Sequence, residues 1–113
     1  MGGIRKEQLE PMSIPPVASR TYVATPGEPD TNVLVSDYLV AVDATAVAST
    51  AYLPDATEVS GRSFKIAKTE NGGNILTIRS IVPTQLLNGS ATRQMVGIGA
   101  VTLTSDGSNY YLG

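Results

Sequence analysis

The chain has 113 residues, a formal net charge of −2, and no histidine or cysteine. This composition excludes histidine-based catalytic triads, histidine or thiolate metal sites and a disulfide framework. The length predicts one domain. No apolar run approaches the ~20 residues of a membrane span, and the charges are scattered, without the basic surface typical of nucleic-acid binding. We therefore expect no enzyme activity, no cofactor, no nucleic acid and no membrane partner.

Residues 1–32 differ in composition from the rest of the chain. They hold five of the seven prolines, and proline removes a backbone donor while favouring extended conformations nearby. This predicts an extended arm followed by a β-domain at 33–113. Apolar side chains spaced along the arm would have no role in water, so we expect the arm to dock on a partner. The predicted docking residues are Ile4, Arg5, Lys6, Leu9, Ile14, Pro15, Pro16 and Tyr22.

From residue 33 onward, short β-type runs alternate with turn signals. This pattern predicts an all-β fold, an antiparallel β-sandwich or jelly-roll-like knob or small barrel. Alternation places Tyr38, Val40 and Val42 on one face of the first run, and Lys65 outward on the third. The expected strands lie at 33–43, 49–54, 63–68, 75–82, 93–98, 100–105 and 109–113.

Two Asn-Gly pairs mark expected turns. The stretch "ENGGN" at 70–74 predicts a tight hairpin, because Asn-Gly supplies positive φ angles. The stretch Asn88-Gly89-Ser90 matches a glycosylation sequon, but we interpret it as a turn.

The last strand ends in Tyr110, Tyr111 and Leu112. An apolar end of this kind must be packed, so we predict that these residues lie in the core or at an oligomer interface. The runs 33–43 and 75–82 are apolar on both faces, which is typical of strands buried on both sides. We therefore expect another subunit to cover the second face.

Three groups of residues could be read as chemical sites, but a structural role explains each of them better. The acidic residues Asp37, Asp43, Asp55 and Glu58 lack the dense spacing of a Ca²⁺ loop. We expect them to cap and turn the chain instead. A Ser–Lys dyad, Ser63 or Ser60 with Lys65, conflicts with a solvated lysine on a strand. The "VGIGA" stretch at 96–100 is not followed by a helix that could bind phosphate, so we expect a bulge or a close backbone approach at a subunit contact.

The motifs between 37 and 113 resemble, in their order and spacing, a small β-domain of tailed-bacteriophage head-decoration, head-fibre and tail-fibre proteins. They are a strand ending in "VDATA", a strand running into "LPDA", then "GRSFKIAK", "NILTI" and a closing "VTLTSDGSNYYL". The resemblance implies a trimeric, β-rich virion protein with strands packed around a three-fold axis. Residues 83–95 depart from the pattern.

Together, these features predict a structural virion protein, made in the host cytoplasm and assembled on the capsid. In this hypothesis a homotrimeric β knob decorates the capsid or forms a head fibre. Its arm binds the major capsid protein or another virion protein, and multivalency raises the avidity. The alternative is a receptor-binding module of a tail fibre that recognises a host surface glycan through the 83–95 loop or exposed tyrosines.

Overall fold

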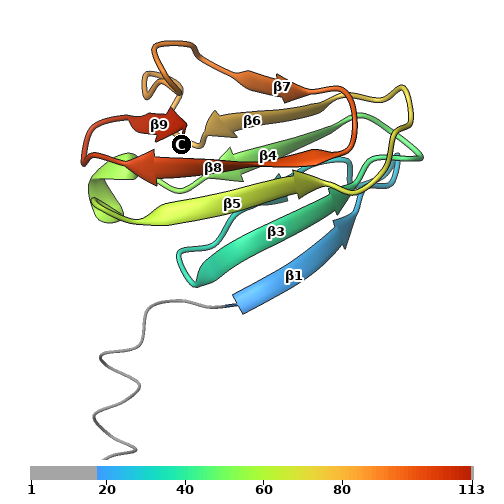
Figure 1. The fold of residues 1–113 in the computed structure, drawn as a ribbon, viewed down its shortest axis with the longest axis horizontal. Coiled ribbons are helices and arrows are strands. Elements are labelled where there is room, and N and C mark those ends of the chain that lie inside the picture. Colours follow the sequence, from blue (N-terminus) through green and yellow to red (C-terminus); the bar gives the residue numbers. More distant parts are fainter. Residues whose placement is uncertain (1–17, 113) are drawn as a thin grey trace, which may run out of the picture.

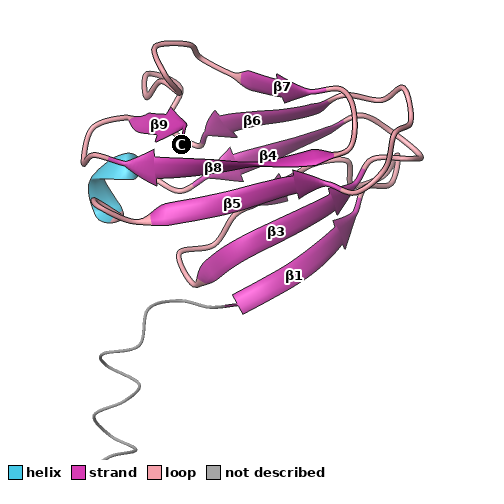
Figure 2. Cartoon of the chain, viewed as in Figure 1, coloured by secondary structure: helices cyan, strands magenta, loops and turns pink. Residues whose placement is uncertain are grey.

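The computed structural model describes residues 18–112, which form an all-β domain of two mixed sheets (Figures 1 and 2). One short 3₁₀ helix, η1 (Ala56–Glu58), precedes the fifth strand. The strands are β1 (Ala18–Val23), β2 (Thr31–Asn32), β3 (Asp37–Asp43), β4 (Ser49–Leu53), β5 (Ser63–Lys68), β6 (Leu76–Ser80), β7 (Arg93–Met95), β8 (Gly99–Ser105) and β9 (Tyr110–Leu112).

The strands of the two sheets alternate along the first two-thirds of the described chain. The five-stranded sheet has the order β1-β3-β5-β8-β9, and the four-stranded sheet has the order β2-β4-β6-β7. Each connection from β1 to β6 crosses to the other sheet, so neighbours within a sheet run parallel. Only β7, β8 and β9 add antiparallel pairs. The prediction of an antiparallel sheet was therefore wrong for the first six strands.

The two sheets share one hydrophobic core between their inner faces. Val40, Val42 and Phe64 come from the five-stranded sheet, while Leu53 and Ile78 come from the four-stranded sheet. All five side chains are fully buried. Fully burying such a side chain contributes roughly 1.5–3 kcal/mol. This core holds the two layers together.

The first predicted strand is shorter than expected, and its alternation is interrupted. The register between β1 and β3 shifts between Ala18 and Ser19, and Tyr38 has no partner in it. Asp37 is buried and Tyr38 is exposed, whereas Val40 and Val42 are buried. The prediction that Tyr38 shares the inner face was wrong because this irregularity turns it outward.

The β structure begins earlier than the predicted boundary at residue 33. Residues 18–23 form β1, which pairs with β3 along its length, and Thr31 and Asn32 form β2. Part of the predicted arm is thus an edge strand of the sheet. Most of the predicted docking residues lie outside the described residues, namely Ile4, Arg5, Lys6, Leu9, Ile14, Pro15 and Pro16.

The hairpin expected at 70–74 does not exist. β5 and β6 belong to different sheets, and the segment between them crosses from one sheet to the other. Neither Asn71 nor Gly72 has a positive φ. The second Asn-Gly pair does form the expected turn: φ is 51° at Asn88 and 83° at Gly89, and Leu87 and Ser90 exchange backbone hydrogen bonds.

Candidate functional site

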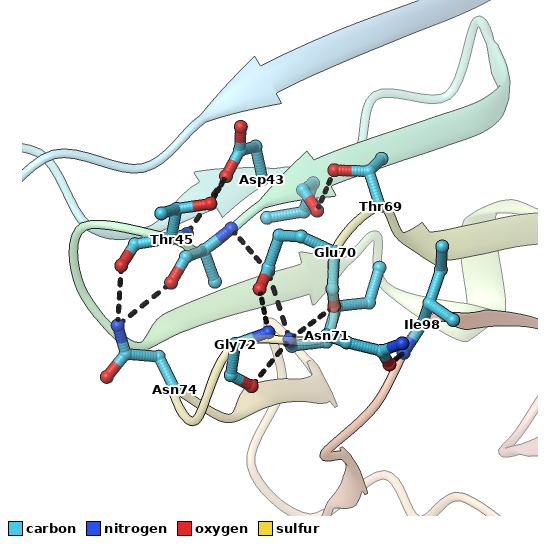
Figure 3. A network of polar contacts seen from close by, with 11 residues as sticks. Asp43, Thr45, Thr69, Glu70, Asn71, Gly72, Asn74 and Ile98 are labelled. Atoms are coloured by element: carbon cyan, nitrogen blue, oxygen red, sulfur yellow. Dashed lines mark hydrogen bonds and ion pairs between the residues drawn. The ribbon is translucent and has the colours of Figure 1, made fainter.

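A polar network fills the end of the domain where β5 leaves its sheet (Figure 3). The side chain of Lys68 is completely buried, and its Nζ lies 2.9 Å from Glu70 Oε2. The same Nζ donates to the backbone oxygens of Glu70 and Gly72. Glu70 also accepts from the backbone N–H groups of Ala44 and Gly72. The hydrogen bond from Lys68 is the main reason that the pKa of the Glu70 carboxyl lies below its usual range.

Side-chain amides extend this network to the neighbouring loops. Asn74 donates to the backbone oxygens of Ala44 and Thr45, and Asn71 Oδ1 accepts from Ile98 N at 2.7 Å. Three loops are thereby joined around one buried ammonium group. Because its polar atoms bond to one another, the network acts as a structural brace.

A second network lies at the opposite end, around Gln85. Its Oε1 accepts from Ala56 N at 2.8 Å and from Ser80 Oγ at 2.6 Å, and its Nε2 donates to Asp55 Oδ1 at 2.7 Å. Asp55 also accepts from the backbone and hydroxyl of Thr57 and so caps η1. The bond from Gln85, followed by those from Thr57, holds the pKa of the Asp55 carboxyl below its usual range.

Edge strand β1 is fastened to the rest of the domain by Arg20. Its guanidinium lies 3.1 Å from the carboxylate of Asp37, whose side chain is 2% exposed, and also donates to the backbone oxygen of Asn32. Asp37 in turn accepts from Leu34 N at 2.7 Å. Tyr22, predicted as a docking residue of the arm, lies in β1, packs against the core and donates its hydroxyl to Glu28 O.

The structure does not bring the candidate catalytic groups together. Ser63 Oγ is hydrogen-bonded to Thr104 Oγ1 at 2.7 Å, and Lys65 lies on the same outer face without a bond to Ser63. Asp43 caps the turn at Thr45. Within residues 18–112, no three Asp, Glu, His or Cys side chains are close enough to hold a metal ion.

Gly97 lies in the "VGIGA" stretch and makes a close approach within the chain itself. A Cβ at this position would meet Asn71 Oδ1 at 3.1 Å. This close approach is to a side chain of the same chain, and the subunit contact expected here stays a prediction.

The three residues of the predicted C-terminal interface have different surroundings. Tyr110 is fully buried in the core of its own chain, and its hydroxyl donates to Pro54 O at 2.5 Å. Leu112 packs against the same core, while Tyr111 is 49% exposed. Of the three, Tyr111 alone is exposed.

Exposed apolar side chains gather at the two ends of the domain, and sequence reasoning missed them as a group. Leu34, Val35 and Tyr38 lie at the start of β3, next to Ala18, which pairs with Asp37. Val96 and Ile98 flank Gly97 at the opposite end, and both are 61% exposed. All five lie within the runs predicted as strands at 33–43 and 93–98, where apolar side chains are expected in the core.

The outer face of the five-stranded sheet carries mostly small side chains. Register places Thr21, Ala41, Ala67 and Ala100 in one row across four strands. The neighbouring row contains Ser19, Leu39, Lys65 and Thr102. The small uncharged side chains of Ala41, Ala67 and Ala100 allow another surface to approach closely, while Lys65 adds a charge beside them.

No protein-family model, curated protein or solved structure matches the chain. Among the described residues, no helix is both long and apolar enough to cross a membrane.

Proposed function

We propose that the chain is a structural protein of a tailed-phage virion. In this proposal it decorates the capsid or forms a head fibre, docks through residues 1–17, and assembles a trimeric, two-layered β knob. The observation that carries the proposal is how the polar side chains are used. The carboxylates Asp37, Asp43, Asp55 and Glu70 are held in caps or ion pairs, while apolar side chains are exposed at both ends. Such a surface favours binding to other proteins over chemistry.

The chain enters the domain beside an exposed apolar cluster. Ala18, the first described residue, pairs with Asp37 at the start of β3. Leu34, Val35 and Tyr38 surround this point and are between 47% and 52% exposed. A partner that binds the residues before Ala18 would therefore also meet these three side chains. Arm and domain would then contribute one continuous contact.

The outer face of the five-stranded sheet is the surface we assign to the trimer. It carries Leu39, Ala41 and Ala67 in its centre and Tyr111 on β9. Ala67→Glu should convert a trimer to monomers in light scattering, since a carboxylate would be desolvated in the contact. Thr77→Glu, on the outer face of the other sheet, should leave the mass unchanged. Equal masses for wild type and Ala67→Glu would contradict this assignment.

Capsid binding tests the function itself. Full-length protein is mixed with capsids, stripped of this protein, from the phage that encodes the chain, and bound copies are counted after sedimentation. Replacing Ile4, Leu9 and Ile14 by serine should abolish binding and leave the circular dichroism spectrum unchanged. Capsid binding equal to wild type would show that the arm does not dock. No binding by the wild type would contradict the function.

A receptor-binding module is the second candidate, favoured by the exposed ring of Tyr111. Aromatic rings of this kind can stack on sugars, although this chain has few of them. Binding of the full-length protein to purified host surface polysaccharide, lost in Tyr111→Ala, would support this candidate over capsid decoration. Absence of binding would leave the capsid proposal preferred.

A further inference from the structure

Within residues 18–112, β1 is the longest sheet edge that nothing covers. The two sheets end in β1, β9, β2 and β7. β2 has two residues, and β7 has three, with Arg93 and Gln94 exposed. The edge of β9 is occupied, because Tyr110 N–H donates to Leu86 O, and Asn88 N–H donates to Tyr110 O. β1 has six residues, and its far side has no strand beside it in the described chain (Figure 1).

The backbone of β1 directs three residues toward this open edge. Ala24 N–H donates to Asp43 O, so Ala24 faces β3. Backbone groups of successive strand residues point to opposite sides. Tyr22 and Arg20 therefore also face β3, whereas Val23, Thr21 and Ser19 direct their N–H and C=O groups outward. All three outward residues have exposed side chains.

β1 lacks the features that keep natural edge strands apart. Proteins protect such edges with proline, lysine, bulges or short strands. β1 contains no proline or lysine, and its register shift lies at its first residue. Its charged residue, Arg20, is neutralised by Asp37. The strand is also fastened to the domain by bonds from Arg20 to Asn32 O and from Tyr22 to Glu28 O, so little ordering is needed before pairing.

We infer that β1 is a docking edge for β1 of a second copy of this chain, in antiparallel register centred on Thr21. In this register Thr21 lies opposite Thr21 of the second copy, and Ser19 lies opposite Val23. These are the three residues whose backbone groups point outward. Each such pair exchanges two hydrogen bonds. The two five-stranded sheets then become one continuous sheet related by a two-fold axis.

The side chains are self-complementary in this register, and two alternative registers are disfavoured. On the inner face, Arg20 lies opposite Tyr22 of the second copy, where its guanidinium can stack on the ring. A register centred on Arg20 would place two cations opposite each other, which is destabilising. A shift by one residue would place inner-face residues opposite outer-face ones. This agreement of backbone direction, face and charge is the argument for a second copy as the occupant.

The pairing goes beyond the proposed function and does not rest on it. It uses the rim of the five-stranded sheet, whereas the trimer contact proposed above uses its face. Both contacts can therefore be made by one chain. Edge pairing would join two chains, or two whole trimers, across a two-fold axis.

Cysteine cross-linking tests the register, because the natural chain has no cysteine. Opposed residues in a hydrogen-bonded antiparallel pair have Cα atoms about 5.5 Å apart, which suits a disulfide. Full-length Thr21→Cys should form disulfide-linked dimers under mild oxidation. Ser19→Cys alone and Gln94→Cys alone should not form such dimers. A mixture of the Ser19→Cys and Val23→Cys proteins should form them, because these two residues lie opposite each other in the proposed register. Equal cross-linking of Thr21→Cys and Gln94→Cys would overturn the proposal.

A second measurement identifies the occupant of the edge. Thr21→Pro removes an outward N–H without breaking a bond to β3, and should halve the light-scattering mass of the full-length protein. Exchange of the Ser19, Thr21 and Val23 amides should be slow in concentrated wild type and fast on dilution. Protection at every concentration would assign the edge to the chain's own remaining residues. Rapid amide exchange at every concentration would show that no second copy covers the β1 edge, which would then be open to a different partner. Either result would overturn the proposal.

Discussion

Tyr110 shows how one residue can join the end of the chain to its middle. Its ring is fully buried, its hydroxyl donates to Pro54 O, and desolvation, together with the nearby Asp55 carboxylate, raises the pKa of its phenol. Tyr110→Phe should lower the free energy of unfolding by about 1 kcal/mol at neutral pH, the typical net contribution of one hydrogen bond. Urea denaturation followed by circular dichroism measures this change.

The raised pKa also predicts a difference between these two proteins in alkali. Unfolded tyrosine ionises near its ordinary value of 10.0, while Tyr110 in the folded protein keeps its proton. The folded state then binds more protons, so stability is lost as pH rises above that value. Tyr110→Phe should lack this part of the loss. Parallel stability curves for both proteins up to pH 11 would contradict the assignment.

For single residues, the sequence predicted burial or exposure correctly where the strand alternates regularly. Phe64 and Ile66 are buried and Lys65 points outward, as the period-two pattern requires. The prediction for Tyr38 was wrong because a shift in register turns its side chain outward. Alternation also places Lys68 on the inner face with Phe64 and Ile66, but the backbone oxygens that accept from its ammonium converge only in the folded loop.

The crossing from β5 to β6 shows that local sequence can determine where a strand lies without determining which strand it pairs with. "ENGGN" has the residues of a hairpin, but β5 pairs with β3 and β8, and β6 pairs with β4 and β7. From β3 onward, strand positions followed from β-propensity and turn residues, whereas β1 and β2 fell within the predicted arm. Strand partners did not, because parallel pairing joins segments far apart in the chain and leaves no short-range signal. The resemblance likewise said nothing about the β1 edge.

The crossing is held by the buried pair of Lys68 and Glu70, which makes a double substitution informative. Glu70→Gln should lower the urea midpoint, because it leaves the Lys68 ammonium buried without a counter-charge. Lys68→Met combined with Glu70→Gln should recover much of this loss, since no unpaired charge remains. Asn109→Ala, at the opposite end, serves as a control that should not couple to either change. A double variant weaker than Glu70→Gln alone would contradict this account.

For the whole molecule, the ionisable groups predict a broad pH plateau. The pKa values of Asp43, Asp55, Glu70 and Asp106 are all lowered by hydrogen bonds. The folded state therefore binds fewer protons than the unfolded state near pH 4, and stability falls as pH drops below the ordinary values of 3.8 and 4.5. With no histidine or cysteine to titrate, melting temperatures should stay level between about pH 5 and 9.

The division between arm and domain can be located by truncation. A chain beginning at Ala18 keeps every strand of the described residues, and we expect it to unfold with the same urea midpoint as the full-length protein. A chain beginning at Thr31 loses β1, and with it the Arg20 partner of Asp37 and the ring of Tyr22 against the core. Losing such a partly exposed ion pair should by itself cost roughly 2 kcal/mol, less than the 3–5 kcal/mol of a fully buried pair.

Arg20→Met in the full-length chain separates this ion pair from the strand. If the ion pair dominates, Arg20→Met should lose nearly as much stability as the chain beginning at Thr31. If backbone pairing and Tyr22 packing dominate, Arg20→Met should lose much less. A chain beginning at Thr31 that is as stable as wild type would contradict both outcomes. The arm would then extend through β1, as the proline pattern had predicted.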